Sequence, residues 1–209
     1  MSFPLRTTLL GLVAASPLLV TLPAHAYEAG DWLVKFGVTQ VNPKSNNGKL
    51  ANGTLAVDVE DATQPSISVT YMATRNLGIE VLGALPFNHT VTLNGDKSAT
   101  TKHLPPTVTA QWFFLPDAQV NPYVGVGLNY TTFFNTRETG PISGANLKLE
   151  DSWGVAAQVG VDIKITESLY ANASVRYMDI DSKAKLNGAR IGTVHIDPVV
   201  STLGFGMRF

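Results

Sequence analysis

The chain has 209 residues, no cysteine and a formal net charge of −1 at pH 7. A chain without cysteine forms neither a disulfide nor a thiolate metal site, and a charge this close to zero gives no sign of nucleic-acid binding. The hydrophobic residues, 44% of the chain, are spread in alternation, as expected of one all-β domain.

The first 26 residues have the features of a secretory signal peptide. Arg6 supplies a positive charge, residues 8–20 are apolar, and the segment ends in an Ala-x-Ala cleavage pattern at Ala24 to Ala26. A membrane anchor is the alternative, but the apolar run is short and Pro23 follows it. We therefore expect residues 1–26 to be removed and residues 27–209 to form the mature domain, in which no later run is long enough to span a bilayer as a helix.

Apolar residues alternate with small or polar residues in eight segments of the expected mature chain. Alternation with a period of two predicts strands that have one apolar face. The charged residues of these strands fall on the opposite face, where they need not meet hydrocarbon; they are Lys35, Glu80, Asp162, Arg176 and Arg208. The expected strands are residues 31–41, 66–73, 77–87, 106–114, 123–134, 152–163, 169–180 and 199–209.

Long polar stretches and short turns alternate between these strands. The long stretches are residues 42–64, 88–103, 135–150 and 181–192. Such asymmetry is typical of outer-membrane barrels, which have long extracellular loops, short periplasmic turns and periplasmic termini. The predicted fold is all-β: an eight-stranded antiparallel transmembrane β-barrel in the outer membrane of a Gram-negative bacterium, surrounded by the lipid bilayer and lipopolysaccharide.

The last strand carries an apolar residue at every second position from Val199, apart from Ser201, and stops at Phe209. A soluble sheet would protect such an edge, whereas a barrel pairs it with the first strand and closes. We expect Phe209 to lie at a membrane interface and to be the residue that the outer-membrane assembly machinery contacts.

A soluble lipocalin is a competing eight-stranded barrel, because Gly30-Asp31-Trp32 resembles the Gly-x-Trp of that fold. Lipocalins are apolar inside and polar outside. Here the small and polar residues form the face that would line the lumen, and no helix follows the last strand, so the membrane barrel is favoured.

The interior of an eight-stranded barrel is filled by side chains or holds one small ligand. Glycines on the inner face, including Gly37, Gly125 and Gly160, fill little space, so we expect a cavity. Pro86 cannot donate to a strand ladder, and the wall could open sideways beside it. The alternative is that Pro86 lies above the membrane, where its strand frays.

Three histidines, His89, His103 and His195, lie at the edges of predicted loops. Lipid acyl chemistry would need a nucleophile and a base within hydrogen-bond reach, and a metal site would need ligand spacing such as His-x-x-x-His. Neither pattern is present. We expect no catalytic site, metal site or cofactor, and a solvated or gating role for His89 and His103.

Eight motifs spread over the whole mature chain resemble the outer membrane protein W (OmpW) family, including its OprG- and AlkL-like members. The motifs are YEAGD (27–31), TYMAT (70–74), LPFNH (85–89), HLPPT (103–107), PYVG (122–125), NYTTFF (129–134), DSWG (151–154) and YMDID (177–181).

The resemblance implies passive uptake of small hydrophobic molecules, and in some members small amino acids, through a narrow lumen with a lateral exit. It places Pro86 beside the exit and Leu82 at the base of the funnel, with Leu85 and Phe87 flanking the proline. The alternative is a structural or adhesive barrel, or a phage or bacteriocin receptor, whose plugged lumen would show side chains meeting across it.

The family often has tryptophan where this chain has Arg176. The arginine predicts a more polar constriction, formed with Glu80 or Asp162 and with Met178 nearby. We expect Arg176→Trp to shift uptake toward apolar solutes, because the substitution removes the lumenal cation. Uptake of a solute panel by reconstituted vesicles measures this, and an unchanged profile contradicts it.

Overall fold

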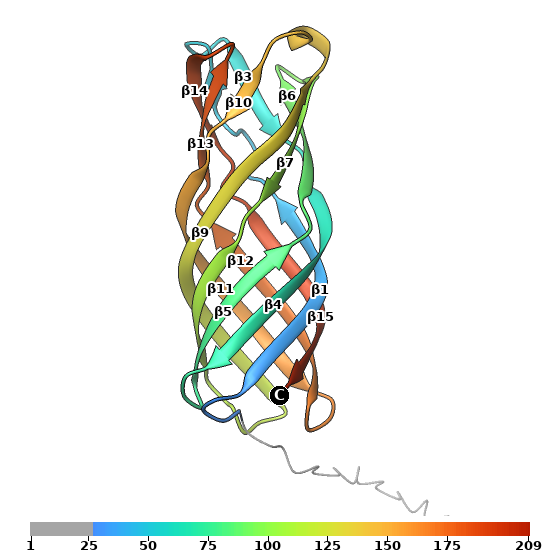
Figure 1. Ribbon diagram of the computed structural model, residues 1–209, viewed down its shortest axis with the longest axis vertical. Coiled ribbons are helices and arrows are strands. Elements are labelled where there is room, and N and C mark those ends of the chain that lie inside the picture. Colours follow the sequence, from blue (N-terminus) through green and yellow to red (C-terminus); the bar gives the residue numbers. More distant parts are fainter. Residues whose placement is uncertain (1–26) are drawn as a thin grey trace, which may run out of the picture.

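The computed structural model describes residues 27–209, so the expected signal peptide and its cleavage site lie outside the described residues. Eight strands of this range form a closed antiparallel barrel in which each strand pairs with the next and β15 pairs with β1 (Figure 1). This confirms the predicted fold class. The barrel strands are β1 (Trp32–Asn42), β4 (Ala62–Met72), β5 (Leu77–Ala84), β8 (Thr107–Phe113), β9 (Val120–Glu138), β11 (Ser152–Lys164), β12 (Leu169–Met178) and β15 (Val199–Arg208).

The expected long loops are largely strands, which extend the barrel wall upward in Figure 1. The long polar stretches between the barrel strands therefore contain strands of their own, which the sequence analysis did not predict. Two Asn-Gly pairs account for much of the difference, because Asn94, Gly95, Asn187 and Gly188 all have positive φ, as type I′ hairpin turns require. The additional strands are β2 (Lys49–Leu50), β3 (Leu55–Val59), β6 (Phe87–Leu93), β7 (Asp96–Leu104), β10 (Leu147–Leu149), β13 (Asp181–Leu186) and β14 (Ala189–His195), with a short 3-10 helix, η1 (Gly140–Ile142).

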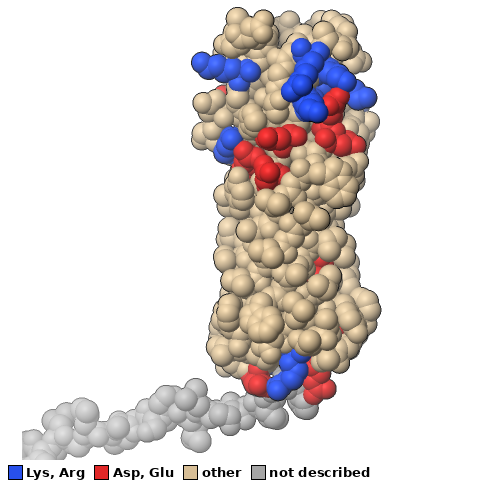
Figure 2. Space-filling view, turned by 90° about the vertical axis from the view of Figure 1, so that its left-hand side faces the viewer, with Lys and Arg blue, Asp and Glu red and all other residues tan. Residues whose placement is uncertain are grey.

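The outer face of the eight-stranded part is a belt of apolar side chains. Trp153 is 73% exposed, Val126 69% and Leu203 68%. Figure 2 shows that acidic and basic side chains gather mainly above this belt and at the bottom of the molecule. Burial of Lys35, Glu80, Asp162 and Arg176 confirms that the charged residues of these four strands face inward. No helix within residues 27–209 is long and apolar enough to cross a membrane.

The last strand closes the barrel, as its alternation predicts. β15 pairs with β1 from Leu33 opposite Arg208 to Asn42 opposite Val199. Beyond these pairs, the amide of Trp32 donates to the carbonyl of Phe209 at 3.0 Å, and the amide of Phe209 donates back at 2.9 Å. The exposed ring of Phe209 lies at the same end of the barrel as Trp32.

Two of the inner glycines do not leave the space that the sequence suggests, because aromatic rings of neighbouring strands lie over them. A Cβ atom at Gly160 would meet the ring of Tyr123, and one at Gly206 would meet the ring of Tyr170. These rings occupy part of the lower lumen, and a cavity of about 330 Å³, including space open to solvent, remains beside Lys35, Glu80 and Arg176. The main apolar cluster instead lies in the upper part of the barrel, where the additional strands enclose it.

Candidate functional site

An aromatic layer fills the lumen at the end that carries Tyr27 and Phe113. The ring of Tyr27 meets the ring of Phe113 edge-on at 5.3 Å, and the rings of Phe113 and Tyr123 lie 5.0 Å apart. Leu33, Met72 and Tyr170 complete this buried cluster. Because rings occupy the space beside the inner glycines, this layer closes the lower end of the barrel.

A charged layer lies above the aromatic layer. Arg176 donates from Nη2 to Glu80 Oε1 at 2.5 Å and to Gln158 Oε1 at 2.8 Å. Lys35 Nζ lies 3.4 Å from Glu80 Oε2, which also accepts a hydrogen bond from Ser68. Glu80 on β5 therefore holds two buried cations, Arg176 from β12 on the opposite side of the barrel and Lys35 from β1.

The other expected constriction residues do not join this ion pair. Asp162 accepts hydrogen bonds from Tyr27 Oη at 2.9 Å and Asn172 Nδ2 at 2.7 Å, so Arg176 pairs with Glu80 instead. Met178 lies higher, beside Leu82 and Phe87. Of the residues expected at the constriction, Arg176, Glu80 and Asp162 are thus buried in the lumen below Met178, which lines a separate cavity.

A cavity with a volume of about 640 Å³, including space open to solvent, occupies the upper barrel. Its polar lining residues are His89, Thr101 and His103. The sequence did not reveal this cavity, because most of the lining residues belong to segments that were expected to be loops. The apolar lining residues are Leu50, Leu55, Val57, Val59, Val91, Leu93, Phe133, Ile142, Leu147, Leu149, Ala184, Leu186, Ile191, Val194 and Ile196.

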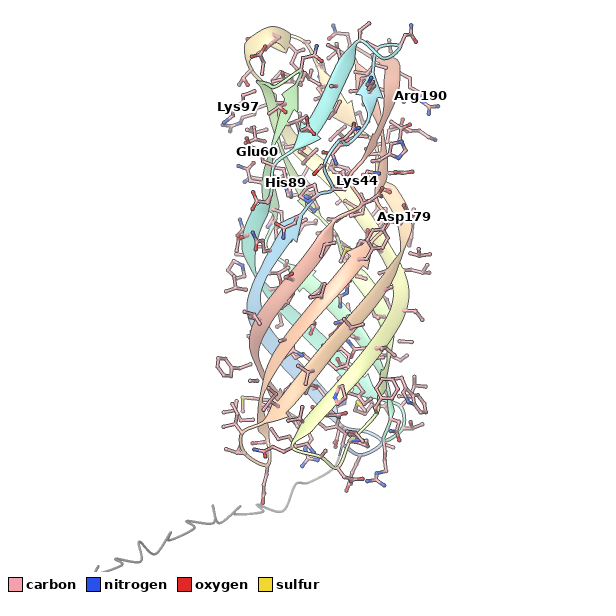
Figure 3. All side chains as sticks on the ribbon, turned by 180° about the vertical axis from the view of Figure 1, so that it is seen from behind. Lys44, Glu60, His89, Lys97, Asp179 and Arg190 are labelled. Carbon is pink, nitrogen blue, oxygen red and sulfur yellow. The ribbon has the colours of Figure 1, made fainter. Side chains whose placement is uncertain are left out.

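The sequence suggested that His89 and His103 are solvated residues at loop edges. In the structure they are buried instead. Each is 2% exposed and lies on a strand, β6 and β7 respectively. Their rings stack with centroids 4.7 Å apart, and His103 also stacks on Phe87 at 5.4 Å. Figure 3 shows His89 beside Glu60 in the upper barrel.

The wall is interrupted beside Pro86. The ladder between β5 and β8 ends at Leu82 opposite Thr107, and the ladder between β6 and β7 resumes at Phe87 opposite His103. The expected continuous strand 77–87 is thus broken after Ala84. Pro105 and Pro106 lie on the facing chain, and like Pro86 they have no amide to donate. Among the described residues, no ladder pair joins segments 83–86 and 104–106.

A second cavity adjoins this interruption. Its volume is about 330 Å³, and its lining includes Leu82, Ala84, Phe87, Met178 and Pro105. Leu85, in contrast, points to the outside and is 58% exposed. The structure therefore brings Leu82 and Phe87 to one cavity beside Pro86, and leaves Leu85 on the outer face of the same segment.

His195 lies outside these cavities, in a group with Asp181 and Asp197 whose nearest ligand atoms are within 4.8 Å of one another. Sequence spacing could not show this group, because its members flank different strands. His195 Nδ1 lies 2.5 Å from Asp181 Oδ1, and Lys44 Nζ lies 2.7 Å from Asp197 Oδ2. Hydrogen bonds and ion pairs among protein groups account for the arrangement.

Comparison with known proteins agrees with this architecture. The sequence model of the OmpW family matches residues 28–209. Outer membrane protein W of Escherichia coli is 43% identical over 195 residues, which cover 89% of this chain and 92% of the relative. The crystal structure of OprG from Pseudomonas aeruginosa has a TM-score of 0.80 at 35% identity and covers 88% of this chain and 98% of that one.

A more distant relative bears a name that refers to metabolism. The dibenzothiophene metabolism operon protein PahQ of Pseudomonas aeruginosa is 24% identical over 197 residues, covering 87% of this chain and 90% of the relative. The family match, the identity to outer membrane protein W and the closed barrel agree with one another. The chain belongs to the OmpW family and is a β-barrel protein of the Gram-negative outer membrane.

Proposed function

We propose that residues 27–209, released from the signal peptide 1–26, form a passive channel for small apolar molecules. Such molecules enter the upper cavity from outside, reach the cavity beside Leu82 and Phe87, and leave sideways into the membrane near Pro86. The observation that carries the proposal is an upper lumen lined almost wholly by apolar side chains above a lower lumen that holds buried charged and aromatic ones. Transfer of an apolar solute from water into the upper lumen is favourable, whereas the charged side chains of the lower lumen exclude the solute.

The interrupted wall supports the sideways step. An apolar solute that passed straight down would have to displace buried Glu80, Arg176 and Lys35, which are held by one another. The route past Ala84 and Pro105 crosses no ladder hydrogen bond. The name of the relative PahQ, which refers to dibenzothiophene metabolism, is consistent with an aromatic, apolar solute.

Ala84→Phe tests this route. Ala84 lines the cavity at the interruption and packs against the upper apolar cluster, so a phenyl ring there occupies the proposed path. We expect uptake to fall about tenfold or more, equivalent to at least about 1.4 kcal/mol added to the barrier. The measurement is the rate at which cells take up N-phenyl-1-naphthylamine, whose fluorescence rises in phospholipid.

Ala173→Phe is the matched control. Ala173 pairs with Val161 and Leu203 on the lipid side of β11, β12 and β15, so the same substitution adds a ring outside the lumen and should leave uptake at the wild-type rate. Equal uptake by wild type, Ala84→Phe and cells without the barrel would contradict the channel. Equal uptake by wild type and Ala84→Phe, with lower uptake by cells without the barrel, would contradict the lateral route.

Pro86→Ala tests the part that proline plays in the interruption of the wall between segments 83–86 and 104–106. The substitution restores one amide on one side, but Pro105 and Pro106 remain unable to donate on the other. We therefore expect Pro86→Ala to slow uptake less than Ala84→Phe does. The same dye assay measures it, and a larger loss than with Ala84→Phe would show that Pro86 itself keeps this interruption open.

A plugged structural or adhesive barrel is the second candidate, because the side chains of the lower lumen do meet across it. Arg176 and Glu80 are the clearest example. On this reading the extracellular strands would bind phage, bacteriocin or another surface. The dye assay separates the two functions, since a plugged barrel passes no tracer in any variant.

A further inference from the structure

The histidine pair is the polar feature of the upper cavity that remains unexplained by packing. His89 and His103 both line the cavity and both are 98% buried, each being 2% exposed. His89 Nε2 and His103 Nδ1 have no hydrogen-bond partner among the described residues. The third polar lining residue differs, since Thr101 Oγ1 bonds to Thr136 Oγ1 at 3.0 Å. A buried polar atom without a partner carries a free-energy cost, which a ligand can remove.

The hydrogen bond at the other nitrogen of His89 identifies its tautomer. His89 Nδ1 lies 2.5 Å from the carbonyl oxygen of Glu60. A carbonyl only accepts, so Nδ1 must carry the proton. In a neutral imidazole the second nitrogen is then an acceptor. His89 Nε2 is therefore a buried hydrogen-bond acceptor without a partner, on a residue that lines the apolar cavity.

Both rings are neutral above the apolar belt, where β6 and β7 lie. Burial, together with a smaller influence of the adjacent His89, lowers the pKa of His103 to about 3. Burial also lowers the pKa of His89, against the opposing influence of the Glu60 carbonyl and of Asp61. A neutral pair attracts no anion, so a carboxylate ligand would lose its hydration without gaining a counter-charge.

Aromatic rings lie next to the histidine pair. His103 stacks on Phe87 with an interplanar angle of 23° and on His89 with 24°. Its ring also lies 5.9 Å from that of Phe133. Such a group of rings offers faces and edges against which an aromatic ligand packs favourably.

We propose that this cavity selects apolar aromatic molecules that carry a hydroxyl group, with the hydroxyl donating to His89 Nε2 and the ring packing against His103 and Phe133. The inference rests on the proposed uptake function and names its preferred solute class: phenols and naphthols over the corresponding hydrocarbons. His89 is the specificity-determining residue, and it would bind the solute on its way to the exit.

The test compares 2-naphthol with 2-methylnaphthalene, which has a methyl group in place of the hydroxyl. Binding to the purified full barrel in micelles is measured by equilibrium dialysis against empty micelles. His89→Phe keeps an aromatic ring and removes the acceptor. We expect it to weaken 2-naphthol binding about fivefold, as loss of one net hydrogen bond implies, and to change 2-methylnaphthalene binding less than about twofold.

His195→Phe is the matched control, because it makes the same change at a histidine outside the cavity, and it should alter neither affinity. If His89→Phe fails to fold, 15N spectra of the wild-type histidines decide: 2-naphthol should shift the Nε2 signal of His89 and 2-methylnaphthalene should not. Equal weakening of both ligands, or an unshifted Nε2 signal, overturns the hydroxyl preference and leaves the channel proposal standing. Binding of neither ligand to wild type overturns both.

Discussion

Replacing Glu80 with leucine is expected to lower the free energy of unfolding by about 3–5 kcal/mol, because it leaves buried cations without a counter-ion. Arg176 Nη2 and Lys35 Nζ both contact the Glu80 carboxylate, and the side chain of Glu80 is 2% exposed. Gln158 still accepts from Arg176 in the variant, but a neutral amide does not balance the charge. Urea unfolding of the barrel from lipid vesicles measures the change.

Asp117→Asn is the control for Glu80→Leu, since it also removes one carboxylate from an ion pair. Arg75 and Asp117 have side chains that are 56% and 68% exposed, and an exposed pair contributes about 0–1 kcal/mol. Similar losses for the two variants would show that water reaches the charged layer. The lower lumen would then be a wet path, contrary to the proposed sideways exit.

Replacing Tyr123 with alanine is expected to cost about 3–5 kcal/mol of stability, as removal of a large buried aromatic side chain does. The ring of Tyr123 lies over Gly160, and its hydroxyl accepts hydrogen bonds from Asn172 at 3.0 Å and Gln158 at 3.4 Å. Lys35 Nζ lies 4.9 Å from the ring centroid. The variant therefore opens a cavity next to the charged layer, and we also expect ion conductance across planar bilayers to rise.

A compensating substitution tests whether Tyr123 stabilises the barrel by filling the space beside Gly160. Gly160 pairs directly with Tyr123 across β11 and β9, and the nearest atoms to a Cβ at Gly160 all belong to the Tyr123 ring. Gly160→Phe alone should destabilise the barrel by about 1–3 kcal/mol through overpacking. Combined with Tyr123→Ala it should restore part of the lost stability, as sites that share a cavity couple. Strict additivity of the two losses would contradict the packing role.

The strand alternation predicted the wall of the barrel well. Trp153 and Leu203 face lipid and Glu80 faces inward because side chains of a strand alternate between its two faces, a local property that a sequence displays directly. The sequence also predicted that Arg176 meets a carboxylate on the inner face, but it left Glu80 and Asp162 as alternatives, and only the structure pairs Arg176 with Glu80. Asn94-Gly95 and Asn187-Gly188 were readable hairpin signals that the loop prediction overlooked.

The upper cavity could not be predicted in the same way. His89 and His103 look like polar loop residues until β6 and β7 pair and turn them inward, and the tautomer of His89 depends on the carbonyl of Glu60, 29 residues away in the chain. Likewise, the sequence suggests empty space beside Gly160, but the ring of Tyr123 from another strand fills this space. The sequence by itself determined which face of each strand meets lipid, because that depends on hydrophobicity and a two-residue period. Only the tertiary structure decided where the lumen is filled and where it is hollow, because that depends on which side chains of distant strands occupy the same space.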